Sequence, residues 1–136
     1  MNLPVRSVLL FNAGFSLASG LLLLLAPGTV GGWLGIDSPG WLRLAGLVLL
    51  GHGALLLGLL PRLGLRTVAV LNLMAVAPYP LLMIVLVATG VIDRTLGQAL
   101  ALIDGAIIAG VAVALALGIR NMGLQNPTST RQPQHA

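Results

Sequence analysis

Residues 98–115 read QALALIDGAIIAGVAVAL, an apolar run that contains a single acid, Asp104. The run has nearly the length of a membrane-spanning helix, which needs about 20 mostly apolar residues at a rise of about 1.5 Å each. A charged side chain is costly inside a bilayer, so an acid there is expected to face other helices and to be neutralised or paired. We therefore expect this segment to be one helix of a bundle, with Asp104 sheltered by its neighbours.

The composition of the whole chain favours a membrane protein. Of the 136 residues, 57% are hydrophobic and only 7% are charged, whereas about 25% of the residues of a soluble domain are charged. The formal net charge is +4, but the arginines are scattered at the edges of apolar runs, so nucleic acid is not an expected partner. The chain has no cysteine, which excludes disulfides and cysteine-bound zinc. The lipid bilayer is the expected surrounding.

Four segments of the chain are long and apolar enough to cross a membrane, and short connections separate them. They are residues 4–26, 39–60, 67–90 and 95–119. Long apolar runs without strict alternation indicate helices and not barrel strands, because every backbone group in lipid needs an internal partner. We predict an all-α, four-transmembrane-helix bundle over residues 1–120. The polar residues 121–136 are predicted to form a disordered cytoplasmic tail.

Residues that favour helix ends flank three of the spans. Ser38, which precedes Pro39, is a predicted N-cap. Thr95 and Gln98 have the spacing of a capping box, and Thr67 is the predicted cap of the third span. These signals explain Gln98 as a capping residue.

The first span also has features of a cleavable secretory signal. Arg6 precedes an apolar stretch, and residues 16–18 read SLA, which resembles a small-residue cleavage site. However, the hydrophobic run continues to Ala26, which is the length of a span and more than a signal needs. We expect this segment to be retained as a spanning helix.

The arginines predict the orientation of the bundle, because cytoplasmic loops carry the excess of Lys and Arg. The side shared by both termini has five arginines, and the opposite side has two. The five are Arg6, Arg62, Arg66, Arg120 and Arg131. Both termini are therefore expected in the cytoplasm, and the bacterial cytoplasmic membrane is the expected location.

Polar side chains inside the spans are the candidate binding residues. They are Asp104, His52, Asn12, Asn72, Tyr79 and Arg43. Asp104 either forms a structural hydrogen bond with an Asn, Ser or Tyr of a neighbouring helix or serves as a substrate or proton site. Arg43 either pairs with Asp104 or extends to the outer interface. Asn72 and Tyr79 are seven residues apart and are expected to share a face of the third span, which Pro78 and Pro80 can kink.

His52 lies between two glycines near the middle of the second span. Its imidazole is either a hydrogen-bonded packing residue, part of a ligand pocket, or a haem ligand that the glycines would allow to approach closely. It is the only histidine in a predicted span, so haem ligation by two histidines would need a dimer. No cofactor is expected, with haem or quinone as the alternatives. No motif of an enzyme or a metal site is present, so no catalytic residue and no metal ligand is predicted.

In its architecture the chain resembles the small DoxX-like bacterial integral membrane proteins. The resemblance depends on four spans, on Asn12 in the first, on leucine-rich segments that end at Pro27 and Pro61, and on an acid in the fourth. It implies an accessory subunit of a membrane redox assembly, often with quinone nearby. It assigns no site residue to this chain.

The sequence leaves three functions open. The leading one is association of helices, in a homo-oligomer or as an accessory subunit, because small residues form a stripe on the fourth span. That stripe is Gln98, Ala101, Gly105, Ala109, Ala112 and Ala116. The second is a small transporter or proton pathway centred on Asp104 and lined by Asn12, Asn72 and Tyr79. The third is haem or quinone binding at His52.

Overall fold

The computed structural model describes residues 4–124, and all regular secondary structure in this range is helical. The helices are α1 (Val5–Leu25), α2 (Pro27–Leu34), α3 (Pro39–Leu59), α4 (Leu65–Val76), α5 (Tyr79–Ala88) and α6 (Thr95–Leu124). Four stretches are long and apolar enough to cross a membrane: Val5–Leu25, Pro39–Leu59, Leu65–Ala88 and Thr95–Gly123. The predicted bundle of four transmembrane helices is confirmed.

The third span is interrupted in its middle, between α4 and α5. Pro78 and Pro80 lack the backbone N–H groups that would continue the helical hydrogen bonds, and two turn residues separate the two helices. The bonds resume when Leu82 N donates to Pro78 O at 3.1 Å. The kink predicted from the two prolines is confirmed, and it divides the span into two helices.

The connection between the first two spans contains the short helix α2, which the sequence analysis did not predict. Pro27 occupies its first turn, where a missing N–H costs nothing. Gly35 ends it in the left-handed conformation, with a φ of 78°, which glycine adopts without strain. The residues that end the first span therefore begin a second helix.

Of the predicted caps, Ser38 is confirmed in position. It is the N-cap of α3, with Pro39 in the first turn, although its side chain makes no capping hydrogen bond. Gly64, and not Thr67, is the N-cap of α4, which begins earlier than predicted. Gln98 Nε2 donates to Ile92 O at 3.1 Å, so this side chain ties the preceding loop to α6.

Helix α6 is longer than the predicted fourth span. It continues to Leu124, into the segment predicted to be a disordered tail. The remainder of that predicted tail, residues 125–136, lies outside the described residues.

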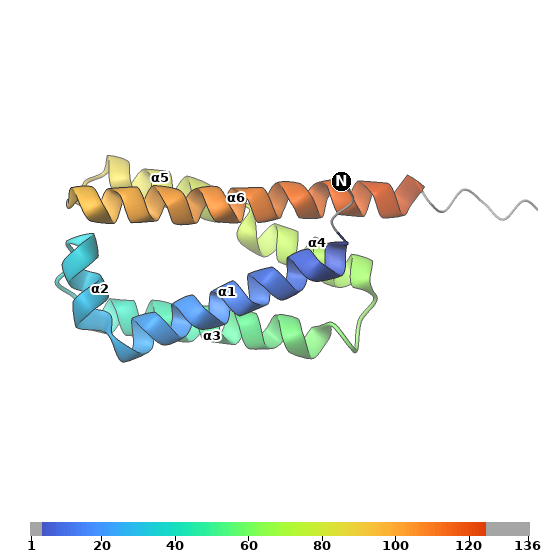
Figure 1. Cartoon of the computed structure of the whole chain (residues 1–136), viewed down its shortest axis with the longest axis horizontal. Coiled ribbons are helices and arrows are strands. Elements are labelled where there is room, and N and C mark those ends of the chain that lie inside the picture. Colours follow the sequence, from blue (N-terminus) through green and yellow to red (C-terminus); the bar gives the residue numbers. More distant parts are fainter. Residues whose placement is uncertain (1–3, 125–136) are drawn as a thin grey trace, which may run out of the picture.

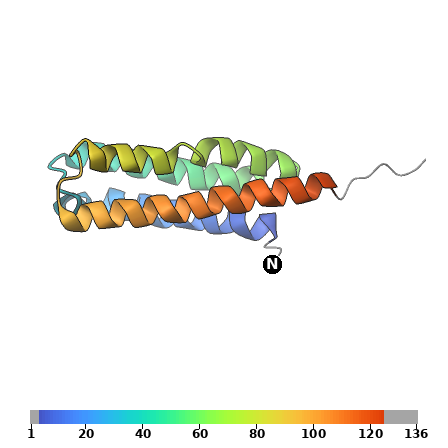
Figure 2. The same cartoon turned by 90° about the horizontal axis from the view of Figure 1, so that it is seen from above.

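The helices run back and forth along one axis (Figures 1 and 2). The beginning of α1, the link from α3 to α4 and the end of α6 lie at one end of the molecule, and α2 and the link from α5 to α6 lie at the other. The main hydrophobic cluster includes residues near the first of these ends. Its buried members are Val5, Val8, Leu9, Ala13, Leu56, Val68, Ala69, Val111 and Leu115.

Glycines allow α1 and α3 to approach each other closely. A Cβ atom on Gly20 would lie 2.8 Å from Gly46 O, and one on Gly46 would lie 2.8 Å from Gly20 O. A Cβ atom on Gly53 would lie 2.8 Å from Ala13 O. Close backbone contact through small residues is the usual way in which transmembrane helices associate. Gly46 is not among the residues singled out from the sequence, and its contact with Gly20 was not predicted.

Helix α2 is held against the start of α6. Arg94 Nη1 donates to Gly32 O at 2.7 Å. A Cβ atom on Gly97 would lie 2.6 Å from Leu34 Cα and 2.8 Å from Trp33 O, so the backbones are in direct contact there. These contacts join the link between the first and second spans to the start of the fourth span.

Helix α5 is packed on one side only. It contacts α6 and α4, but none of its Cα atoms lies within 8 Å of a Cα atom of α1, α2 or α3. None of its residues is buried. The half of the third span formed by α5 therefore has only α6 as a lateral neighbour among the described helices.

Candidate functional site

The polar side chains inside the spans form two groups, and the first consists of Asn12, His52 and Asn72. Asn12 Nδ2 donates to Asn72 Oδ1 at 3.0 Å and lies 3.4 Å from His52 Nε2. The exposed fraction is 0% for Asn12 and 1% for Asn72. This group joins α1, α3 and α4.

The hydrogen bonding of this first group is incomplete. Asn12 Oδ1 and Asn72 Nδ2 are buried and have no partner among the described residues. An unpaired polar group in an apolar interior costs about 1–3 kcal/mol, so the two asparagines contribute less stability than a fully satisfied pair would. The group therefore contributes more to the choice of helix partners than to the stability of the bundle.

This geometry predicts strong coupling between the two asparagines. Asn12→Leu leaves Asn72 Oδ1 without its donor, and Asn72→Leu leaves Asn12 with His52 alone. We expect each substitution to lower the free energy of unfolding by about 1 kcal/mol, and the double variant to lose clearly less than the sum. A double-mutant cycle in mixed micelles measures this, and additive losses would contradict the shared hydrogen bond.

The second group is the pair of Tyr79 and Asp104. The Tyr79 hydroxyl donates to Asp104 Oδ2 at 2.5 Å. Tyr79 is the first residue of α5, so the interruption of the third span positions this hydroxyl. Asp104 lies on the face of α6 that continues through the buried residues Ile108 and Val111. Both members of the pair are half-buried.

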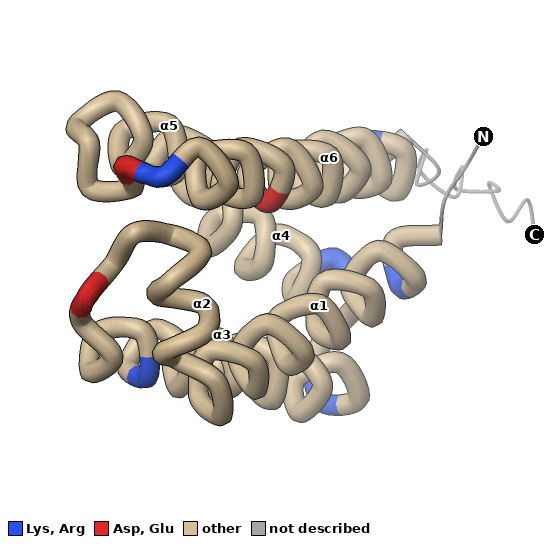
Figure 3. Tube along the Cα trace, turned by 60° about the vertical axis from the view of Figure 1, so that its left-hand side comes forward, with Lys and Arg blue, Asp and Glu red and all other residues tan. Residues whose placement is uncertain are grey.

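Asp104 is the one charged residue in the middle of a described helix, and the others lie near helix ends or in the links (Figure 3). Its hydrogen-bond partner is a tyrosine, which is one of the alternatives expected from the sequence. Arg43 is exposed, four residues into α3. The structure therefore gives Asp104 a neutral partner.

The two groups lie at different depths. Tyr79 follows Asn72 by seven residues, which corresponds to about 10 Å along a helix. The predicted cavity lined by Asn12, Asn72 and Tyr79 around Asp104 is thus divided: the asparagines bond to each other, and the tyrosine bonds to the acid. The pattern of the sequence had placed Asn72 and Tyr79 on one continuous helix face.

The glycines beside His52 have different surroundings. Gly53 packs against Ala13 and Leu17 of α1, whereas Gly51 has open space around it. The half-buried imidazole directs Nε2 at Asn12, so helix packing accounts for both the histidine and one glycine. No cluster of three or more potential metal ligands occurs in residues 4–124. Haem or quinone binding at His52 stays a prediction that these contacts do not favour.

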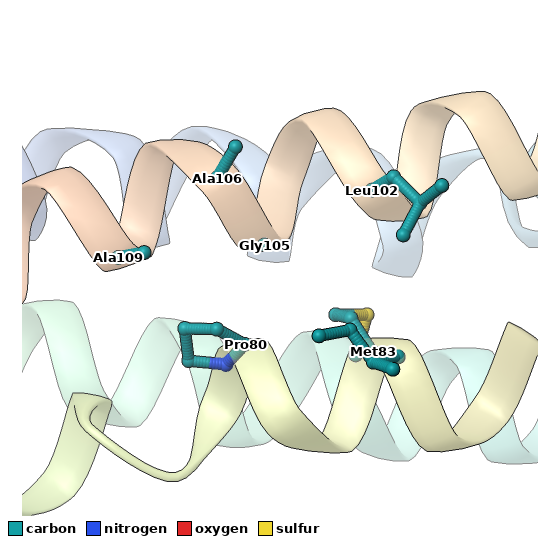
Figure 4. A pocket seen from close by; sticks show the side chains of 7 residues that line it. Pro80, Met83, Leu102, Gly105, Ala106 and Ala109 are labelled. Atoms are coloured by element: carbon teal, nitrogen blue, oxygen red, sulfur yellow. The ribbon is translucent and has the colours of Figure 1, made fainter.

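An apolar groove of about 210 Å³ lies between α5 and α6 (Figure 4). It is lined by Pro80, Met83, Ile84, Leu102, Gly105, Ala106 and Ala109. At Gly105, α6 lies close to α5: an added Cβ atom on this glycine would lie 3.4 Å from Met83 Cβ. The groove uses part of the predicted small-residue stripe, and Met83 fills the gap that Gly105 leaves.

Comparison of the chain with protein families, with curated proteins and with solved structures gave no match. The resemblance to DoxX-like proteins therefore stays a prediction.

Proposed function

We propose that this membrane protein acts by association of its α5–α6 face with a further transmembrane helix, in a homo-oligomer or as an accessory subunit of a complex. The observation that carries the proposal is the one-sided packing of α5. This helix is apolar, contributes no buried residue, and contacts only α4 and α6. The third span is also the least buried of the four: within its apolar 18-residue window 11% of the residues are buried, against 33% for the first span.

The shape of the α5–α6 face suits a helix as its partner. Gly105, Ala106 and Ala109 form a small-residue side of the groove on α6. In lipid there is little hydrophobic driving force between helices, so their association depends on close packing at such small residues. A second helix laid in the groove would gain contacts with these small residues.

The proposal also includes an orientation, with both termini in the cytoplasm of a bacterium. Arg6, Arg62, Arg66 and Arg120 lie at the end of the bundle shared by the described chain ends. Arg43 and Arg94 lie at the other end, together with Asp37 and Asp93. The excess of arginine at one end supports this orientation by the positive-inside rule.

Filling the groove tests the proposal. Ala106 is exposed, so Ala106→Leu adds bulk to the groove without entering the core of the chain. We expect the variant to weaken the assembly at least tenfold, measured by native mass spectrometry in mild detergent and by cross-linking in membranes. Ala54→Leu, at an exposed position of α3, is the matched control and should leave the assembly unchanged.

Two results would contradict the proposal. One is a wild-type protein that is strictly monomeric and without partners in both measurements. The other is an equal loss of assembly in the Ala54→Leu control, which would mean that the α5–α6 face has no special part in association.

A further inference from the structure

We propose that Asp104 and Tyr79 form a binding site for a lipid-soluble cation, a protonated amine that carries an apolar chain. This site goes beyond association through the groove, because it uses the opposite flank of the α5–α6 pair. On α6, Asp104 shares a face with Ile108, whereas the groove residue Ala106 lies about 200° further around the helix axis.

The charge of the ligand follows from the surroundings of Asp104. It is the only acid within the spans, since Asp37 and Asp93 lie in the links between helices. Its partner is the neutral Tyr79 hydroxyl, and the described arginines lie near the ends of the helices. An acid in lipid is either protonated or paired with a positive charge, and a charged carboxylate there needs such a partner. A cationic ligand supplies the charge that the chain itself does not.

The carboxyl group has one oxygen left to bind such a ligand. Oδ2 accepts the bond from Tyr79, while Oδ1 accepts none from the described residues and is not among the fully buried polar atoms without a partner. An ammonium group can donate to Oδ1 and at the same time lie near the aromatic ring of Tyr79, whose face attracts cations. Half-burial of both side chains permits contact with a ligand and limits the access of water.

A further polar group lies at the same depth. Ser19 follows Asn12 by seven residues on α1, as Tyr79 follows Asn72 on the third span. Asn12 and Asn72 are bonded to each other and the two spans run in the same direction, so Ser19 and Tyr79 lie at similar depths. Ser19 is half-buried on the face of α1 that also carries Asn12. Its hydroxyl is a candidate second contact for an ammonium group.

The apolar part of the ligand follows from the route to the site. At one end of the bundle, α2 is held to α6 by Arg94 and Gly97. Toward the other end lies the hydrophobic cluster. At the side, α5 is not packed against α1 or α3. A ligand therefore reaches Asp104 from the bilayer, and only a molecule with an apolar chain is concentrated there.

Titration of the protein in lipid nanodiscs with a fluorescent long-chain primary amine tests the site. We expect saturable binding by the wild-type protein and binding at least tenfold weaker by Asp104→Asn, which keeps the shape of the side chain and an acceptor for Tyr79. Tyr79→Phe should weaken binding several-fold. Asp93→Asn, which removes an acid from a link, is the matched control and should bind like the wild type.

The neutral long-chain alcohol with the same fluorophore gives a test that needs no variant. It should bind at least tenfold more weakly than the amine to the wild-type protein. Equal binding of amine and alcohol, no saturable binding of the amine, or unchanged binding by a folded Asp104→Asn variant would each overturn the proposal. A carboxyl group that exchanges only protons would give the second of these results. Ala106→Leu should keep amine binding, so failure of this site is distinguishable from failure of association.

Discussion

Replacing Gly46 by leucine is expected to separate α1 from α3 and to lower the free energy of unfolding by about 3 kcal/mol or more. A Cβ atom at this position would lie 2.8 Å from Gly20 O and 3.1 Å from Leu24 N. Both are backbone atoms, which cannot rotate away as a flexible side chain can. The two helices would have to move apart along the most extensive helix pair of the bundle.

Gly51→Leu is the matched control on the same helix, because a Cβ atom at Gly51 meets nothing within 4 Å. Unfolding by increasing fractions of a denaturing detergent, followed by circular dichroism, measures both variants. Equal stability of the Gly46→Leu protein and the wild type would show that α1 and α3 are not in close contact at this point.

Replacing Gly97 by leucine is expected to detach α2 from α6 and to cost about 2 kcal/mol. A Cβ atom at Gly97 would lie 2.6 Å from Leu34 Cα. The leucine side chain would therefore clash with the backbone of α2. The chain has two tryptophans, and one of them, Trp33, lies in α2 beside this contact. A change in tryptophan fluorescence should therefore accompany the loss of stability.

Gly110→Leu provides the comparison for this second substitution. Gly110 lies on the same helix, is exposed, and has open space where a Cβ atom would be added. The variant should keep the stability and the fluorescence of the wild type. If both substitutions on α6 have the same effect, the contact between α2 and α6 does not contribute as described.

Local features of the sequence predicted the spans but not their neighbours. Hydropathy and length identify four spans because lipid imposes the same requirement on every spanning helix. The short helix α2 has local start and end signals in Pro27 and Gly35, but its contact with Gly97, which is far away in the sequence, is not marked by any of them. The same holds for Gly46: glycine predicts that some helix comes close, and only the fold reveals that α1 is that helix.

The candidate site was predicted in part. A single acid in a span predicts a partner on another helix, and Tyr79 was among the residue types expected for it. The prolines predicted a kink, but the sequence could not divide the polar residues into two groups, because helix periodicity does not show which helix each side chain meets. Pro78 and Pro80 interrupt the third span, so Asn72 is bonded to α1 and Tyr79 is bonded to α6.

The central claim is that four helices cross the membrane, and cysteine labelling tests it most directly, because the chain has no cysteine of its own. Leu63→Cys lies between α3 and α4, Val91→Cys lies between α5 and α6, and Ile103→Cys lies within α6; all three positions are exposed. A charged, membrane-impermeant maleimide should react with the first two from opposite sides of the membrane, and with Ile103→Cys from neither. Reaction of Leu63→Cys and Val91→Cys from the same side, or reaction of Ile103→Cys in intact membranes, would contradict the account.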